Sequence, residues 1–410
     1  MLASFRVAIA QTQIVTLNNR FFTATQPMSL APKFSSKFVD KDYLLCLADS
    51  FLYTCQKTGP LTQVWNPIIK LSGGSGGAWQ KAVNISESTG LPVWCYGSYW
   101  VNKPITISKT NLNLTIYGNN SLITTTNNTN YAVFQRPSPS NMTDANLMVE
   151  SKYVIKNIRL TGNSYQRAFD LGPGYGQWFE GIRMTGFGTG ILLRFALNTM
   201  VQNCYALACD SGFVATYGNW SGASTSNSQS NHTKFIGCQV HTIGTATIGF
   251  GVYAASGVEI LSCIIEGEGV INGIDFDAQN ATVVKDFTVM GTHFECANGA
   301  ANAFVKVRLR EGIATINTVF GQYPALLVDA GSTAGDVFIH IEKVVGWVAN
   351  GSGKAFYNAG GVNYILENNA SIMINKASIP GLFSGTAVAE CTSAGCGLNK
   401  WLWKGLPSFQ

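Results

Sequence analysis

A short apolar pattern returns along residues 167–360 at intervals of 22 to 37 residues. Each occurrence has a small residue, then Phe, Ile or Leu, then a variable residue and usually another apolar one. The central residues of the occurrences are Phe169, Ile191, Phe213, Phe250, Ile274, Phe304, Leu326 and Phe356. Because the apolar residues alternate with period two, the repeated unit is predicted to be a β-strand and not a helix.

A second series of mostly apolar residues advances in parallel with the first. Its members are Ile158, Ile182, Cys204, Cys238, Cys263 and Phe287, and each follows a residue suited to a tight turn: Asn157, Gly181, Asn203, Gly237, Ser262 or Asp286. Two registers that advance together predict a solenoid of stacked coils and not separate globular domains. Coils of this length, holding two or three short strands each, predict an all-β parallel β-helix.

The segments outside the repeat divide the chain into four predicted regions. Residues 1–70 are expected to form an attachment or cap region. Residues 71–120 are expected to hold a capping helix and the first coils, residues 121–382 the β-helix, and residues 383–410 a cap or oligomerisation segment. The run Ser72–Gly77 reads as a flexible boundary, and Ala78–Ile85 as an amphipathic helix that covers the open end of the first coil. The interruptions at 141–152 and 219–233 are expected to be protruding loops.

Composition narrows the class of protein. Charged residues make up only 12% of the chain, and the net charge of +5 is not clustered, so no nucleic-acid partner is expected. We expect no membrane insertion and no signal peptide, because the apolar runs do not suit either. We expect no metal or cofactor, because the spacing of His and Cys does not suit a metal site. Cys204, Cys238 and Cys263 are expected to be buried thiols. The pairs Cys46/Cys55 and Cys391/Cys396 are candidates for disulfides that close loops, and the sequence does not decide whether they form. The Asn-x-Ser/Thr sequons do not establish glycosylation.

The start of the solenoid resembles a known superfamily. Ala78-x-Gln80-x-Ala82-Val83, then Gly90-x-Pro92-Val93, Pro104-Ile105-x-Ile107 and Ile116-Tyr117-Gly118, is similar to the entry of pectate-lyase-like β-helices, above all in the phage tailspike and depolymerase branch. The resemblance covers roughly 75–370 and implies a right-handed parallel β-helix with an N-terminal capping helix. It leaves activity open, because lyases, hydrolases and non-enzymatic spikes share this entry. The acidic pair usual before the cap helix is replaced here by Gly73–Gly77.

Candidate catalytic residues are carboxylates at outward positions. Asp275 and Asp277 lie two apart on one predicted strand, so they share a face with Cα atoms about 6.6 Å apart. Inverting glycosidases use carboxyl groups roughly 6.5–9.5 Å apart, which favours an acid and base pair, although a solvated pair or a turn-capping Asp has the same pattern. Glu266 is predicted to stack on His241 of the preceding coil, as a further catalytic candidate or as a surface ion pair.

Candidate carbohydrate-binding residues are aromatic side chains outside the repeat. Trp178, Tyr205, Trp220 and Tyr253 fall at loop or outward positions, and Arg194 lies three coils before Asp277. A flat aromatic face stacks well on the apolar face of a sugar ring. Scattered surface aromatics have no such role in many proteins, so the alternative is that they are ordinary surface residues.

Taken with the resemblance, these features predict a virion surface spike on a phage tail or capsid vertex that recognises host-surface polysaccharide. It would attach to other virion proteins through residues 1–70 and act as a homotrimer. A first alternative is a polysaccharide depolymerase, a hydrolase or lyase, on the same scaffold. A second is a structural capsid or tail component without a ligand.

Overall fold

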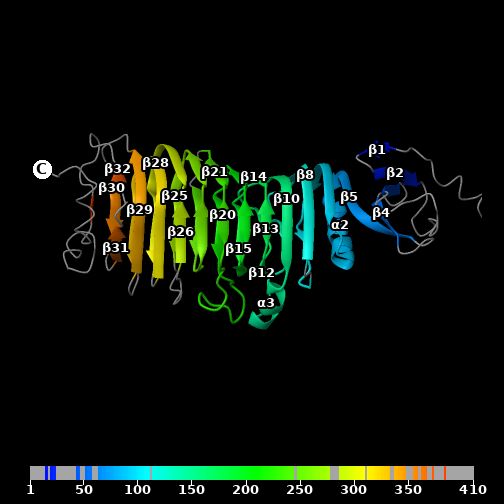
Figure 1. Cartoon of the computed structure of the whole chain (residues 1–410), viewed down its shortest axis with the longest axis horizontal. Coiled ribbons are helices and arrows are strands. Elements are labelled where there is room, and N and C mark those ends of the chain that lie inside the picture. Colours follow the sequence, from blue (N-terminus) through cyan, green and yellow to red (C-terminus); the bar gives the residue numbers. More distant parts are fainter. Residues whose placement is uncertain are drawn as a thin grey trace, which may run out of the picture.

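The protein is mostly β, with parallel strands in curled sheets (Figure 1). The computed structural model describes the backbone of residues 14–16, 19–24, 43–46, 51–57, 63–110, 113–243, 247–277, 286–309, 312–332, 337–347, 354–358, 362–366, 372–373 and 383–384. Side chains are described within 76–317, with gaps. Over these residues there are two helices, α2 (Gly76–Thr89) and α3 (Met142–Val149), and no helix is long and apolar enough to cross a membrane.

The strands begin with a short group at the N-terminal end. It consists of β1 (Ile14–Thr16), β2 (Asn19–Ala24), β3 (Tyr43–Cys46), β4 (Phe51–Lys57) and β5 (Gln63–Ser75). The second half of β5 pairs in parallel with β6. The Gly/Ser run expected to be a flexible boundary is therefore ordered: its first four residues end β5, and Gly76 and Gly77 begin α2. Strand pairing satisfies its backbone groups, which composition alone did not reveal. The four-region division stays a prediction.

Three columns of parallel strands follow. Column 1 holds β13 (Trp178–Glu180), β17 (Met200–Gln202), β20 (Lys234–Ile236), β23 (Val258–Leu261) and β26 (Asp286–Met290). Column 2 holds β14 (Arg183–Thr185), β18 (Tyr205–Leu207), β21 (Gln239–Thr242) and β24 (Ile264–Gly267). Column 3 holds β7 (Ile105–Thr106), β9 (Ala132–Gln135), β11 (Arg167–Asp170), β15 (Thr189–Arg194), β19 (Ser211–Thr216), β22 (Thr247–Tyr253) and β25 (Val270–Asp277).

Longer strands bend from one column into the next. They are β6 (Val93–Val101), β8 (Asn113–Thr125), β10 (Lys152–Thr161), β27 (His293–Leu309), β28 (Gly312–Ser332) and β29 (Val337–Trp347). The remaining strands are β12 (Gly174–Tyr175), β16 (Ala196–Leu197), β30 (Lys354–Asn358), β31 (Val362–Leu366), β32 (Ile372–Met373) and β33 (Phe383–Ser384).

Strand register confirms most of the apolar series. Column 3 pairs Phe169 with Ile191, Ile191 with Phe213, Phe213 with Phe250 and Phe250 with Ile274. The next two predicted positions are wrong. Val305 and Val328 follow Ile274 in register, in place of Phe304 and Leu326, and Phe356 then pairs with Val328 as expected. The register of β27 shifts near Ala300 and Ala303, where small residues make the alternation ambiguous.

The second series is confirmed as far as Cys263. Asn157, Gly181, Asn203, Gly237 and Ser262 all have positive φ, as the tight bends between columns 1 and 2 require. The prediction that Phe287 follows the next bend is wrong. Phe287 pairs with Val258 in column 1, and the bend falls at Gly291, which is followed by the buried Thr292.

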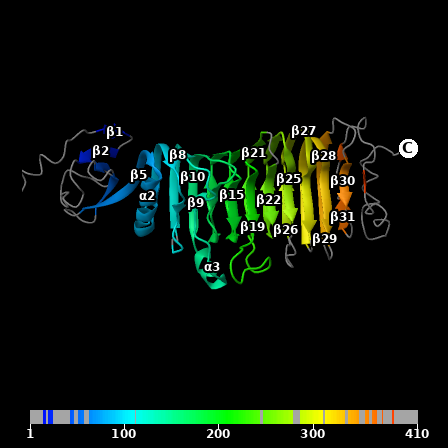
Figure 2. The same cartoon turned by 180° about the vertical axis from the view of Figure 1, so that it is seen from behind.

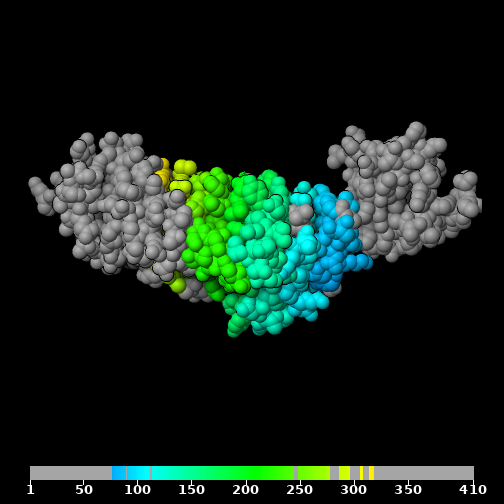
Figure 3. Space-filling model, turned by 90° about the horizontal axis from the view of Figure 1, so that it is seen from below, coloured from blue at the N-terminus to red at the C-terminus, as the bar shows by residue number. Residues whose placement is uncertain are grey.

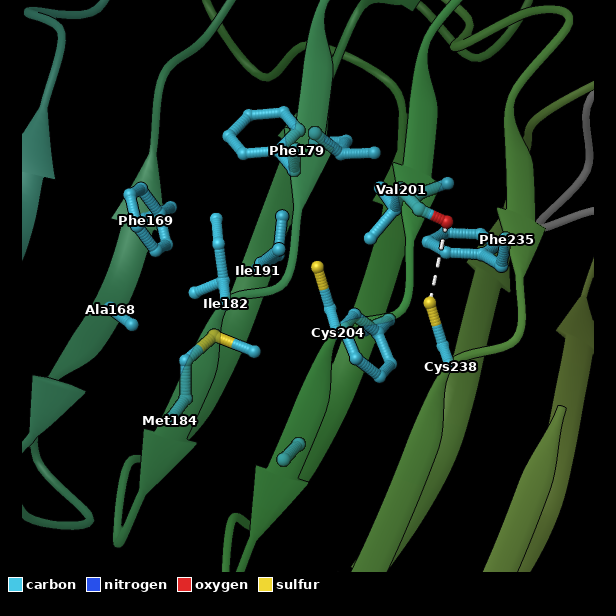
Figure 4. Packing of buried hydrophobic residues seen from close by; sticks show 14 of the residues in the cluster. Ala168, Phe169, Phe179, Ile182, Met184, Ile191, Val201, Cys204, Phe235 and Cys238 are labelled. Atoms are coloured by element: carbon cyan, nitrogen blue, oxygen red, sulfur yellow. Dashed lines mark hydrogen bonds between the residues drawn. The ribbon is translucent and has the colours of Figure 1, made fainter. Parts of the chain in front are cut away.

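One hydrophobic core runs between the columns. Rings of neighbouring strands stack, with centroids 5.2 Å apart for Phe134 and Phe169 and 5.2 Å for Phe213 and Phe250. Cys204, Cys238 and Cys263 are buried free thiols, as predicted, and the Cys238 Sγ donates to the Val201 carbonyl at 3.3 Å (Figure 4). The cysteines at 46, 55, 391 and 396 lie outside the described side chains.

The small residue of the apolar pattern has a steric cause. A Cβ added to Gly190 would lie 2.4 Å from the Gly212 carbonyl oxygen, one on Gly212 would lie 2.7 Å from that of Gly249, and one on Gly249 would lie 2.4 Å from that of Gly273. The backbones of consecutive strands therefore approach more closely at this position than any side chain allows.

Helix α2 confirms the helix predicted over Ala78–Ile85 and extends it at both ends. It ends at Thr89, before the positive-φ Gly90. Trp79, Ala82 and Val83 of its apolar side are buried in the main core, where Trp79 meets Tyr99 and Phe134 edge-on at 5.3 and 5.4 Å.

A lobe projects from one side of the columns, formed by α3 and the loop 217–231 (Figures 1 and 2). Figure 3 shows the molecule from the side on which the lobe lies. The interruption at 141–152 was predicted to be a loop. It contains α3, whose first turn is capped by the Asn141 side chain, which accepts from the Asp144 N–H at 2.9 Å. Ala145 of α3 packs with Phe195 and Trp220 in a small second core.

The buried Arg136 joins the lobe to the columns. All five N–H bonds of its guanidinium have acceptors, namely the carbonyl oxygens of Ser108, Lys109, Met148 and Pro173 and the Ser151 hydroxyl. Beneath it, the Tyr153 ring centroid lies 5.6 Å from the Arg136 Cζ. Burial lowers the pKa of Arg136, while the nearby tyrosine and carboxylates oppose that shift.

Alkaline pH is expected to destabilise the protein partly through Tyr153. Burial raises its pKa to about 12, above the value of roughly 10 in an unfolded chain. The folded state therefore keeps the phenolic proton longer, so this contribution to stability is complete below about pH 10 and is lost as the pH rises towards 12. Between pH 9 and 11.5 the free energy of unfolding of the wild type should fall by about 2 kcal/mol more than that of Tyr153→Phe, measured by urea denaturation. Parallel pH curves for the two proteins would contradict this.

Candidate functional site

Column 3 brings Tyr253, Asp275 and Asp277 together on its outer face. Asp275 pairs in register with Gly251 on one side and Lys306 on the other, and Asp277 pairs with Tyr253. The alternate residues Val252, Phe276 and Val307 are fully buried in the core. Strand alternation therefore directs the polar residues away from the core, as the sequence predicted.

Asp275 is an almost buried carboxylate, with 7% of its surface exposed. The Asn272 amide donates to its Oδ2 at 3.2 Å, and the Lys306 Nζ lies 3.3 Å from its Oδ1. The Lys306 ammonium donates to Oδ2 at 3.5 Å, whereas Oδ1 accepts no hydrogen bond and is held by charge attraction alone. The Asn272 Oδ1, also buried, has no donor. These two buried acceptor atoms therefore lack a donor among the described residues, which is unusual for buried oxygens.

Tyr253 lies beside this carboxylate. Its ring occupies the space over Gly251, since a Cβ added there would come 2.7 Å from the ring carbon Cε2. Burial raises the pKa of Tyr253, and the negative charges of Asp275 and Asp277 raise it further. The phenol therefore stays protonated at neutral pH and is a hydrogen-bond donor.

Arg194 lies on the same outer face, two strands before Tyr253 and three before Asp277, as predicted. Its guanidinium bonds Asp170 at 2.7 Å and the Asn219 side chain at 2.9 Å. Burial raises the pKa of Asp170, while Arg194 and Arg167 lower it. Arg194 thus links column 3 to the start of the lobe.

The remaining predicted residues lie elsewhere. Glu266 is on the outer face of column 2, in register with His241, whose Nδ1 is 3.0 Å from its Oε1, which confirms the predicted stacking. Tyr205 is on that face too. Trp178 belongs to column 1, where the Lys156 ammonium lies 3.5 Å from its ring centroid.

Trp220 does not lie at an exposed position. Only 9% of it is exposed, because its loop folds back onto α3 and its indole N–H points to the Met142 sulfur at 3.2 Å. Its ring packs on Phe195, which leaves no open face for a sugar. Of the predicted site residues, the structure therefore places only Tyr253, Asp275 and Asp277 side by side.

Lys306 and Asn272 were missed by sequence reasoning. Lys306 stands directly after Val305, as Asp275 stands directly after Ile274. Assigning Phe304 to the apolar series shifted the register by one and concealed this match. Nothing in the sequence marks Asn272 as a site residue except its place on the same strand as Asp275.

No family model matches the chain, and no curated protein matches it. Solved structures with a similar fold include the Acinetobacter phage vB_ApiP_P1 tailspike protein, with TM-score 0.47, 13% identity, and coverage of 90% of this chain and 67% of that one. The enzymatically active domain of bacteriophage CBA120 tailspike protein 4 has TM-score 0.47 and 12% identity over 87% of this chain, which spans 52% of that protein. An alginate lyase from Paenibacillus sp. str. FPU-7 has TM-score 0.41 and 12% identity, with 78% and 99% coverage. Similarity at this level does not decide function.

Proposed function

We propose that the chain is a right-handed parallel β-helix that binds a polysaccharide on the outer face of column 3, around Tyr253, Asp275 and Lys306. Consecutive tight bends between columns 1 and 2 and the single core between the columns support a closed solenoid. The observation that carries the binding proposal is the nearly buried Asp275 carboxylate next to the Tyr253 ring, whose Oδ1 accepts no hydrogen bond among the described residues.

This arrangement suits a sugar. An aromatic ring stacks on the C–H face of a pyranose, while carboxylate and amide oxygens accept from its hydroxyl groups. The Asp275 carboxylate, in a residue that is 7% exposed, is an acceptor of this kind, and the Tyr253 phenol is a donor to a ring or hydroxyl oxygen. The Lys306 ammonium offsets the charge of Asp275, so a neutral sugar does not meet an unbalanced buried anion.

The proposal extends to the setting of the protein. The cap-helix entry resembles that of tailspikes, so we place the chain on a virion surface, attached to other virion proteins through residues 1–70 and assembled as a homotrimer. The ligand is then a host-surface glycan. Localisation on purified virions by immunogold labelling, together with the mass of the assembly by light scattering, tests these two points.

Glycan binding should depend on Tyr253. We expect Tyr253→Ala to weaken binding of host capsule or lipopolysaccharide roughly tenfold or more, because it removes the stacking ring. Tyr165→Ala removes a tyrosine that is 64% exposed elsewhere and serves as the matched control. Isothermal titration of both variants checks this. Equal affinities for Tyr253→Ala and wild type would remove Tyr253 from the site.

Depolymerase activity is a second candidate, favoured by two carboxylates two residues apart on one face. One of them, Asp275, is held by Asn272 and Lys306, and Asp277 is the more exposed, which gives the two carboxyl groups different environments. Glu266 is on another column and is not part of this proposal. If the chain cleaves the polymer, size-exclusion chromatography will show shortening that disappears in Asp275→Asn; unchanged polymer length with retained affinity would leave binding alone. Absence of any glycan binding together with exclusive virion location would favour a structural component.

A further inference from the structure

Three lysines on the outer faces of the columns are each paired with a carboxylate at the same register position on an adjacent strand. The pairs are Lys156 with Glu180 at 2.7 Å, Lys234 with Glu259 at 2.8 Å and Lys306 with Asp275 at 3.3 Å. These surface charges are therefore balanced locally, strand by strand.

On column 2, Arg159 and Arg183 have no such partner. The two arginines are paired in register on β10 and β14, both are exposed, and adjacent strands lie about 4.7–4.9 Å apart. Within the described part of the chain neither has an ion pair. Arg183 has no hydrogen bond there, and Arg159 donates only from Nε, to the Asn120 carbonyl at 2.9 Å.

No register neighbour compensates the two positive charges. The first carboxylate along this face, Glu266, lies three strands beyond Arg183 and is engaged by Gln239 and His241. The register neighbours are Leu122 beside Arg159 and Tyr205 beside Arg183, and neither is acidic. Like charges placed directly opposite each other destabilise a sheet, whereas an anion that bridges them removes the repulsion. The Asn120 contact anchors Arg159 and leaves both of its Nη groups for such an anion.

Hydroxyl and aromatic side chains surround the arginine pair. Thr161 and Thr185 lie two residues further along the same strands, in register with each other and on the same face. Thr161 is in register with Thr124, and Thr124 with Trp100, which is 56% exposed. From the strand of Trp100 to that of Tyr205 there are four strand steps, about 19 Å.

We infer that this outer face of column 2 binds an anionic polysaccharide, with a sulfate or carboxylate held between Arg159 and Arg183 and sugar rings on Trp100 and Tyr205. Guanidinium groups match the planar, multidentate geometry of these anions. The face is an open row of strands, which suits an extended polymer better than an enclosed small molecule. The inference rests on the proposed function only in taking a polysaccharide as the ligand, because its residues are separate from Tyr253 and Asp275.

Dextran, carboxymethyl-dextran and dextran sulfate test this face, because they share one backbone and differ in the anion. Binding of each polymer to the full chain is measured by biolayer interferometry at one fixed ionic strength. The variants are Arg159→Gln/Arg183→Gln and the control Lys103→Gln/Lys152→Gln, which removes the same two charges from other exposed positions. We expect the arginine variant to lose roughly tenfold or more of the affinity for one or both anionic polymers, and the control to stay close to wild type.

Three outcomes would overturn the inference: an arginine variant that binds like wild type, a control that loses as much, or wild type that binds neither anionic polymer more tightly than dextran. Preference for carboxymethyl-dextran over dextran sulfate, or the reverse, identifies the anion. Tyr253→Ala in the same assay separates this inference from the proposed function. If it retains all binding of host glycan while the arginine variant loses the anionic polymers, the column 2 site stands and the column 3 site fails.

Discussion

Replacing Arg136 by leucine is expected to lower the free energy of unfolding by about 3–5 kcal/mol. Leucine fills part of the volume but offers no donor to the four carbonyl oxygens and the hydroxyl that the guanidinium now satisfies. The usual tolerance for apolar replacement of a buried charge applies when its partners are replaced as well. Here the partners are mostly backbone, and they would remain buried without donors.

Urea denaturation of Arg136→Leu gives the measurement, with Arg183→Leu as the control. Arg183 is an exposed arginine without a hydrogen bond among the described residues, so its substitution should change stability by no more than about 0.5 kcal/mol. Because Arg136 joins the lobe to the columns, the lobe should also lose amide-exchange protection before the core does. Similar stabilities for the two leucine variants would show that Arg136 is not a structural junction.

Phe213→Ala should cost about 3–5 kcal/mol, the range found when a buried phenylalanine is truncated. The ring is fully buried, stacks on Phe250 with centroids 5.2 Å apart and lies 5.9 Å from Phe235 of column 1. The cavity would open between two columns, and the closely spaced backbones at Gly212 and Gly249 leave little freedom for it to collapse.

Thermal and urea unfolding of Phe213→Ala are compared with those of Phe213→Leu. Leucine keeps most of the volume and should cost less than about 1.5 kcal/mol. If alanine and leucine destabilise equally, shape and not volume governs the position. If neither destabilises, the ring does not belong to the stacked core, and the register of column 3 is wrong.

The fold was predictable because the residues that recur once in each coil are the apolar residues that pack in the core. Phe169, Ile191, Phe213, Phe250 and Ile274 each face the core at the same register, so each repeat confirmed the next. The prediction failed where that signal is ambiguous. Around Ala300–Ala303 the chain is too rich in small residues to fix the alternation, and Phe287 was assigned to the bend because Asp286 resembles a turn residue.

The candidate site was predictable only as far as the register held. Asp275, Asp277 and Tyr253 were placed together by counting from Phe250 and Ile274, and the structure agrees. Lys306 was not predicted, because the register assigned to its strand was shifted by one residue. Trp220 was misplaced for a different reason: its burial depends on α3, 78 residues away, and no local pattern reports a contact of that range.

The lobe has a consequence for how such a chain can change. Strand β19 ends at Thr216 and β20 begins at Lys234, and both strands keep their register with the strands before and after them. The intervening loop therefore enters and leaves the scaffold without altering its geometry. Recombination or engineering could exchange this segment for a longer or differently shaped one, which would give a new surface on unchanged columns of strands.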